Sequence, residues 1–401
     1  MPLQNGIEIL AMPGPTNVPM EVLRAMNRPS TDVYAGELVG VTDSCIDDLK
    51  RVFRTSGSVY LFAANGHGAW EAAISNVLSR GEKALVLSSG IFARGWGEMG
   101  RKLGVEIEIL DAGWGRAVDP RLVEERLQAD RSGAIKAILV VQVDTGSSVV
   151  NDIPAIRRAI DAARHDALLL VDTIASLATT PFEMDGWGVD VAVGASQKGL
   201  MMSPGLSFNA VSDKAHAAHA TANLVTGYWD WTFRRGAQHY MKYCGTPPVH
   251  LVYGLRKSLD ILLAEGLEAV FARHATLANA VRQAVAGWAA AGVMDFNVQE
   301  PSQRSNSVTT VTLKGFDPQP LLEFARAKCG IILGLDLSDR AERGFRIAHM
   351  GHVNAAMLLA TLGVIETAMT FLDIPHGAGT RAAIRSLASE LKTSEVQRCA
   401  R

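Results

Sequence analysis

The feature that most constrains this chain is the alternation of short apolar runs with amphipathic segments between residues 60 and 215. The apolar runs predict strands at 84–88, 105–109, 137–141, 167–171 and 189–193. The amphipathic segments predict helices at 69–78, 121–128 and 153–164. Most of the runs are apolar throughout, which indicates strands covered on both faces. The alternation of strand and helix therefore favours an α/β fold with a mostly parallel sheet.

The pattern changes near Thr246. Residues 247–290 are mostly helical in pattern, and Pro and Asn are frequent in the first thirty residues. Later segments predict strands at 308–313, 331–333 and 345–348, and helices at 320–327 and 355–371. We therefore divide the chain into an N-terminal arm or loop (1–30), a large domain (31–260) and a smaller C-terminal α+β domain (261–401).

Composition excludes several classes of function. The 401 residues are 48% hydrophobic and 20% charged, with a formal net charge of −2, so no basic surface for nucleic acid is expected. The apolar runs are too short to span a membrane. The four cysteines have neither metal-ligand spacing nor the density of a disulfide framework, so we expect no metal site. With no pattern of a secretory or peroxisomal signal, we expect a cytoplasmic protein.

Two residues at the ends of predicted strands carry the chemistry. Asp172 ends the apolar run that begins at Leu168, and Lys198 follows the run that ends near Val193. Open α/β sheets bind ligands at the carboxyl ends of their strands. Pyridoxal-5′-phosphate (PLP) needs such a pair, because a lysine forms a Schiff base with it and a carboxylate keeps its pyridine nitrogen protonated. Taken alone, the pair is equally compatible with a helix cap and a surface lysine.

A second motif lies at the start of a predicted helix. Ala64-Asn-Gly-His-Gly-Ala-Trp-Glu71 follows a short apolar run. Small residues allow backbone N–H groups to approach an anion, and a helix N-terminus favours negative charge. Helix starts of this kind are common, so the motif gains meaning only beside the Asp172 and Lys198 pair.

Together these motifs resemble the class V aminotransferases of PLP fold type I, in particular the alanine–glyoxylate and serine–glyoxylate aminotransferase group. The resemblance runs from Pro13-Gly-Pro-Thr-Asn17 to the helix after Gly351. Its most specific parts are Val171-Asp-Thr-Ile-Ala-Ser176, Ser196-Gln-Lys198, Tyr253-Gly-Leu-Arg256 and Phe345-Arg-Ile-Ala-His349. It implies a seven-stranded, mostly parallel large-domain sheet beside the smaller domain.

The resemblance also implies roles for single residues around the cofactor. Lys198 would hold PLP and move the proton during the reaction, and Asp172 would pair with the pyridine nitrogen. Phe92 would stack on the ring, in place of the tryptophan often found there. Thr145 would bond the ring oxygen of the cofactor. The phosphate would be held by Gly66, His67 and Gly68, with Gln197 nearby.

The resemblance extends to the substrate and to a second subunit. Arg346 would bind the substrate carboxylate through two parallel hydrogen bonds, with Gly14 in the Pro13–Pro15 loop supplying a backbone N–H. A structural ion pair is the alternative for Arg346. Tyr243 and Thr246 would reach the phosphate in the neighbouring subunit of a homodimer with shared active sites, unless they form only a turn.

Some positions depart from the family. Many relatives have His-Asn-Glu-Thr-Ser-Thr-Gly where this chain has Gln142-Val-Asp-Thr-Gly-Ser-Ser148, and the phosphate loop has become Ala64-Asn-Gly-His67. These changes suggest an altered amino donor. The segment 228–243 is rich in aromatic and basic residues, and we hypothesise that one of four cations meets a second acidic group on a donor such as aspartate: Arg234, Arg235, His239 or Lys242.

We therefore predict a PLP-dependent aminotransferase that moves an amino group from serine, alanine or aspartate to glyoxylate or pyruvate through Lys198. A pyridoxamine–pyruvate type aminotransferase is the closest alternative. A PLP-dependent lyase or cysteine desulfurase is less favoured, because the context of Cys329 indicates packing. A PLP-fold sensor fused to a DNA-binding module would need a basic domain for which the sequence leaves no room. The donor, the acceptor and the pathway stay open.

Overall fold

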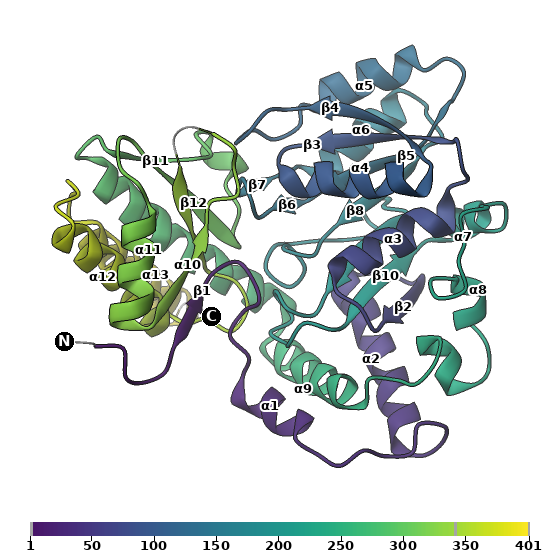
Figure 1. Ribbon diagram of the computed structural model, residues 1–401, viewed down its shortest axis with the longest axis horizontal. Helices are drawn as coiled ribbons and strands as arrows, with labels where there is room; N and C mark the ends of the chain where they lie inside the picture. Colours follow the sequence, from purple (N-terminus) through teal and green to yellow (C-terminus); the bar gives the residue numbers. More distant parts are fainter. Residues whose placement is uncertain (1–2, 341–342, 400–401) are drawn as a thin grey trace.

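The computed structural model describes residues 3–340 and 343–399. Its strands form a seven-stranded sheet, a five-stranded sheet and a two-stranded ribbon. The two larger sheets lie in separate halves of the molecule (Figure 1). The chain is thus organised around two sheets, as the change of pattern near Thr246 indicates.

The seven-stranded sheet confirms the predicted α/β architecture. Its order is β2 (Ser58–Phe62), β10 (Ser207–Val211), β9 (Val191–Ala195), β8 (Leu168–Asp172), β5 (Ile135–Val141), β3 (Lys83–Ser88) and β4 (Glu106–Asp111). The pairs from β9 to β4 are parallel, whereas β10 runs antiparallel to both of its neighbours. Strand β2 is the short apolar strand expected before Ala64, whereas β10 was not predicted from sequence.

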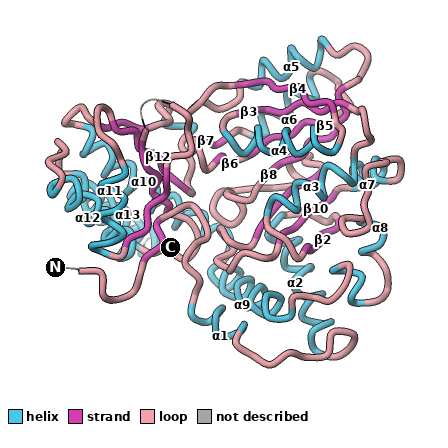
Figure 2. Tube along the Cα trace, in the orientation of Figure 1, coloured by secondary structure: helices cyan, strands magenta, loops and turns pink. Residues whose placement is uncertain are grey.

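Helices cover both faces of this sheet (Figure 2). They are α2 (Glu37–Phe53), α3 (Gly66–Val77), α4 (Ile91–Leu103), α5 (Pro120–Ala129), α6 (Ile153–Ala162), α7 (Asp213–His219), α8 (Trp231–Arg234), the 3-10 helix η1 (His239–Tyr243) and α9 (Val249–Glu265). Consecutive strand residues enter different cores: Leu169 packs in one and Leu170 in the other. Burial on both faces is the reason these strands have apolar runs instead of alternating sequences.

The smaller sheet has the order β1 (Ile9–Ala11), β13 (Ile331–Leu335), β14 (Gly344–Ala348), β12 (Val308–Leu313) and β11 (Met294–Phe296). Its helices are α10 (Leu267–Ala289), α11 (Gln319–Cys329), α12 (Ala355–Phe371) and α13 (Gly379–Cys399), with the 3-10 helix η2 (Pro301–Gln303). The ribbon consists of β6 (Val143–Asp144) and β7 (Val149–Val150).

The first thirty residues contain more structure than the predicted arm or loop. Strand β1 pairs in parallel with β13 and so belongs to the smaller sheet, and α1 (Met20–Met26) packs against α9. The sequence signal was weak because β1 has only three residues. The chain between β1 and α1 consequently passes from one half of the molecule to the other, beside Lys198.

The predicted long helical region consists of two helices. Gly266, with φ +85°, separates α9 from α10. Helix α9 packs in the core of the seven-stranded sheet. Along α10, Val270 still belongs to that core, whereas Leu277 belongs to the core of the smaller sheet. The two cores therefore meet within α10.

Candidate active site

Asp172 and Lys198 reach the same edge of the large sheet. Asp172 is the last residue of β8, and Lys198 follows the end of the adjacent parallel strand β9. Both line one cavity of about 140 Å³. The cavity residues are Gly66, His67, Trp70, Phe92, Val141, Val143, Thr145, Asp172, Ile174, Ala175, Gln197 and Lys198. The edge of the sheet therefore brings together seven of the residues predicted from sequence.

The amine of Lys198 is buried next to the N-terminal segment. It donates a hydrogen bond to the carbonyl of Pro13, and the Lys198 carbonyl accepts one from Thr16 Oγ1 at 3.0 Å. Burial, and after it the nearby Arg346 guanidinium, lowers the pKa of Lys198 to about 8, although the charge of Asp172 opposes this shift. A fraction of this amine is therefore uncharged and nucleophilic near neutral pH.

Gly14 fits against this lysine. Its φ is +106°, and a Cβ built on it would lie 2.5 Å from Lys198 Nζ. Its N–H, which we predicted to bind a substrate carboxylate, donates to the carbonyl of Met12 at 2.8 Å. In this structure Gly14 therefore makes room for the lysine, and its own donor is engaged.

Asp172 is a buried carboxylate with two donors. Its Oδ1 accepts from the Ile174 N–H at 2.6 Å, and its Oδ2 accepts from Trp70 Nε1 at 2.8 Å. Burial raises the pKa of Asp172 to about 7, although these two bonds lower it. The nearby charge of Asp144 raises the pKa and that of Lys198 lowers it. The carboxylate is thus held in one orientation toward the cavity residues.

The start of α3 provides small residues at the cavity. Asn65 caps this helix, since its Oδ1 accepts from the N–H groups of His67 at 3.1 Å and Gly68 at 3.4 Å. Gly66 and His67 line the cavity, whereas Gly68 packs against Ala64 and Trp229. The Oε1 atom of Gln197 is buried and without a hydrogen-bond partner. The Asn65 side chain therefore occupies the His67 and Gly68 N–H groups in this structure, whereas the Gln197 oxygen is left without a donor.

Asp144 connects the segments that carry Phe92 and Thr145. This buried carboxylate accepts from the Phe92 N–H at 2.9 Å and from the Gly146 N–H at 2.9 Å. It thereby joins the first turn of α4 to the turn of the β6–β7 ribbon. Burial raises the pKa of Asp144, and the surrounding N–H groups oppose the rise.

Arg346 lies on β14 and reaches the edge of the site. Its Nε donates to the carbonyl of Leu335 at 2.6 Å and its Nη1 to the carbonyl of Thr145 at 2.9 Å. No ion pair of Arg346 occurs among residues 3–340 and 343–399. Burial lowers the pKa of this guanidinium to about 10. A structural ion pair therefore does not account for this buried cation in the described part of the chain.

Comparison with known proteins identifies the family. The family model described as aminotransferase class V matches residues 9–334. The chain belongs to the class V aminotransferases.

This class V aminotransferase is 39% identical over 385 residues to a serine–glyoxylate aminotransferase of Methylorubrum extorquens, covering 93% of this chain and 94% of the relative. It is 38% identical to an L-aspartate–glyoxylate aminotransferase of Paracoccus denitrificans, covering 96% of each. A solved structure of pyridoxamine–pyruvate aminotransferase from Mesorhizobium loti matches with a TM-score of 0.89 and 25% identity, over 97% of this chain and 100% of the other.

Tyr243 and Thr246, which were expected at the phosphate of a neighbouring subunit, do not line the cavity of this class V aminotransferase. Tyr243 is 1% exposed and its hydroxyl is 2.9 Å from Thr42 Oγ1, whereas Thr246 is exposed. The Tyr253–Arg256 motif also has packing roles, because Arg256 binds Asp48 of α2 and so joins α9 to that helix. These residues lie on the face formed by α2, η1 and α9.

The structure contradicts the hypothesis that cations of 228–243 meet the substrate for Arg234 and His239. For Lys242 the hypothesis stays a prediction, because its ion pair with Asp43 lies at the surface. Arg234 is 4% exposed and donates to the carbonyls of Tyr228, Leu61 and Lys242. His239 is buried between the Val33 carbonyl and Thr42, and Lys242 pairs with Asp43.

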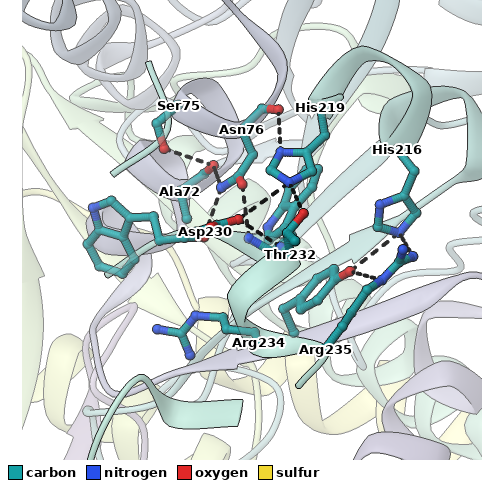
Figure 3. Close-up of polar contacts among 12 residues, drawn as sticks. Ala72, Ser75, Asn76, His216, His219, Asp230, Thr232, Arg234 and Arg235 are labelled. Atoms are coloured by element: carbon teal, nitrogen blue, oxygen red, sulfur yellow. Dashed lines mark hydrogen bonds and ion pairs between the residues drawn. The ribbon is translucent and has the colours of Figure 1, made fainter. Parts of the chain in front are cut away.

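Arg235, the fourth cation, is exposed, yet it contacts Tyr60 Oη at 2.9 Å and His216 Nε2 at 2.7 Å. Figure 3 shows Arg234 and Arg235 among the polar contacts of this region, which also includes Asn76, His219 and Asp230. The segment is basic because its cations bind backbone carbonyls and neighbouring side chains.

Trp70 is the functional residue that sequence reasoning missed. It lies on α3, four residues after Gly66, and its indole reaches Asp172. The spacing from the glycine motif places Trp70 one helical turn into α3, on the same face as Gly66. The sequence contained that signal, but not the identity of the acceptor.

The described part of the chain has no helix long and apolar enough to cross a membrane. Within the same residues, no group of three or more His, Cys, Asp or Glu is arranged to hold a metal ion.

Proposed function

We propose that this aminotransferase binds PLP through Lys198 and transfers an amino group from a small amino acid to glyoxylate or pyruvate. The observation that carries the proposal is the meeting of Lys198 and Asp172 in one cavity, with an aromatic ring and a helix N-terminus beside them. The unpartnered Gln197 Oε1 supports a ligand in this cavity, because a buried acceptor oxygen is rarely left without a donor from a ligand or water. The Nε2 of the same amide would be the group that donates to the phosphate.

The residues that would hold the cofactor follow from the cavity. Lys198 would bind it covalently, Asp172 would face its pyridine nitrogen, and Phe92 would lie against its ring. Gly66, His67 and Gln197 would receive the phosphate, with Gly68 supporting the turn. When bound, PLP supplies an electron sink for the bond at the substrate Cα.

The protein groups perform the remaining steps. The Lys198 amine, with its lowered pKa, takes the proton from the Cα of the amino donor, and in the second half-reaction it delivers a proton to the Cα of the product formed from the oxo acid. Arg346 holds its Nε and Nη1 on carbonyls, which fixes its plane and leaves Nη2 to bind the substrate carboxylate. The buried setting of these groups strengthens each electrostatic contact.

Serine and aspartate are the donors we favour first, because a serine–glyoxylate and an aspartate–glyoxylate aminotransferase are similar to this chain over more than nine-tenths of its length. Alanine is the third. The internal partners of Arg234 and His239 weaken our sequence-based argument for aspartate. The choice between donors therefore depends on measurement.

A homodimer is part of the proposal. Tyr243 and Thr246 lie outside this chain's cavity, and the exposed Thr246 is available to a second subunit. A cytoplasmic location is also proposed. Cys45, Cys244 and Cys329 are free, in keeping with a reducing compartment.

The test adds serine, aspartate and alanine one at a time to the purified, PLP-loaded enzyme without any oxo acid. Loss of the yellow colour with one donor, and its return with glyoxylate or pyruvate, would establish both half-reactions. A protein that stayed colourless after incubation with PLP would contradict the proposal.

A second candidate, pyridoxamine–pyruvate transfer, is favoured by the similarity to the Mesorhizobium loti structure. Formation of alanine from free pyridoxamine and pyruvate, without an amino acid donor, would identify it.

A further inference from the structure

Trp70 makes the one side-chain hydrogen bond to Asp172 among the residues that the structure describes. Its Nε1 lies 2.8 Å from Asp172 Oδ2, and the bond is buried. The other carboxylate oxygen accepts from the backbone of Ile174 at 2.6 Å. An indole N–H is a donor only, so its orientation toward the carboxylate is unambiguous.

The indole has little freedom to turn away. Trp70 is 1% exposed, and it stacks on Trp96 with ring centroids 5.9 Å apart and planes 18° apart. The ring centroid of Trp70 also lies 6.4 Å from that of Phe92 and 4.6 Å from that of His67. Residues from α3 and α4 therefore hold the donor in place before any ligand binds.

Asp172 needs such a donor because its surroundings oppose its charge. Burial is the largest influence on its pKa, and Asp144 adds a second negative charge nearby. The Ile174 N–H, the Trp70 indole and the Lys198 charge are the groups that oppose these effects. Of the two hydrogen bonds, only the Trp70 bond depends on a side chain and can be removed by substitution.

We propose that Trp70 is a positioning residue that holds the Asp172 carboxylate, ionised and correctly oriented, for the pyridine nitrogen of the cofactor. The inference rests on the proposed function and deepens it, since it assigns a role to a residue that acts through Asp172. Trp70 also lines the cavity beside Phe92 and His67. It therefore links the aromatic wall of the site to its carboxylate.

The experiment measures the dissociation constant of PLP for the apoenzyme by absorbance titration. Trp70→Phe keeps a ring and removes the N–H, and we expect PLP binding to weaken about 10- to 100-fold, as for a lost hydrogen bond to a charged group. Trp288→Phe is the matched control, because Trp288 is equally buried and its Nε1 also donates to a carboxylate, Glu366 Oε2 at 2.9 Å, outside the cavity. We expect it to change PLP binding by less than about threefold.

Two further variants separate positioning from packing. If Trp70 acts through Asp172, the Trp70→Phe substitution should weaken PLP binding much less in the Asp172→Asn variant than in the wild-type protein. Trp70→His places a ring N–H near the same position but removes more volume. Positioning therefore predicts tighter PLP binding by Trp70→His than by Trp70→Phe, and packing predicts the reverse.

The inference alone would be overturned if Trp70→Phe bound PLP as tightly as the wild type. It would also be overturned if Trp70→Phe and Asp172→Asn weakened PLP binding additively in the double variant. A wild-type protein that bound no PLP would overturn the proposed function and this inference together. Should Trp70→Phe fail to fold, PLP binding by Trp70→His is compared with that of Trp288→Phe. Near-wild-type binding by Trp70→His supports positioning, and a loss as large as that of Asp172→Asn contradicts it.

Discussion

Replacement of Gly14 by alanine should disturb Lys198 specifically. Gly14 has φ +106°, where a residue with a Cβ is strained by about 1–3 kcal/mol. The new Cβ would also lie 2.5 Å from Lys198 Nζ and 2.7 Å from its Cε, closer than van der Waals contact. A Lys198 side chain that moved away from this Cβ would lose its hydrogen bond to the Pro13 carbonyl.

The magnitude follows from these two effects. We expect Gly14→Ala to lose about 2–4 kcal/mol of stability, as the sum of backbone strain and the displaced lysine contact. The covalent reaction of Lys198 with PLP should slow at least about tenfold, since the amine leaves its place in the cavity. The assays are denaturant unfolding of the apoprotein and borohydride trapping of PLP over time.

Gly113→Ala is the matched control. Gly113 has φ +84°, but no atom lies within 4 Å of a Cβ built on it. It therefore carries backbone strain without crowding, and should leave PLP trapping unchanged. If Gly14→Ala and Gly113→Ala lost equal stability and both trapped PLP at the wild-type rate, the proposed packing of Gly14 on Lys198 would be refuted.

Three more predictions follow from the site and its surroundings. Arg234→Met should lower the free energy of unfolding by about 3 kcal/mol or more, because the carbonyls of Tyr228, Leu61 and Lys242 lose a charged donor. Exposed Arg235→Met should cost much less in the same denaturant titration, and equal losses would contradict the buried role. Asp144→Asn should destabilise the protein by about 1–3 kcal/mol, since an amide has one acceptor oxygen where the carboxylate uses two, whereas Asp119→Asn at an exposed cap should cost less. The rate of PLP attachment should rise with pH to a plateau above about pH 8, because Lys198 loses its proton there, with Asp172 and Arg346 as the charged groups beside it. Arg346→Gln removes a positive charge that lowers the pKa of Lys198, so it should move this midpoint to higher pH, and an unmoved or lower midpoint would contradict the assignment.

The predictable part of the fold was the part where burial fixes the sequence pattern. The strands β3, β5 and β8 lie between two cores, so nearly every residue in them is apolar and each was found within two residues of its bounds. Strand β10 contains Ser207 and Asn209 and was missed. Both are buried, and the Asn209 amide bonds the Ala69 carbonyl across to α3. A tertiary partner of this kind leaves no periodic signal.

The same limit applies to the site. Lys198 and Asp172 could be predicted because the carboxyl ends of neighbouring parallel strands lie at the same edge of the sheet, independently of the loop conformations. The donor on Asp172 could not, because Trp70 looks like any buried aromatic residue until its acceptor is known. Arg234 and His239 were mistaken for substrate contacts since a sequence shows charge but does not show the backbone carbonyls that bind it.

The most direct test of the central claim is to reduce the PLP-loaded protein with borohydride, digest it and locate the modified lysine by mass spectrometry. The structure predicts a single phosphopyridoxyl group on Lys198, and none at that position in Lys198→Ala. Modification mainly at another lysine, or no modification after saturation with PLP, would contradict the proposed site.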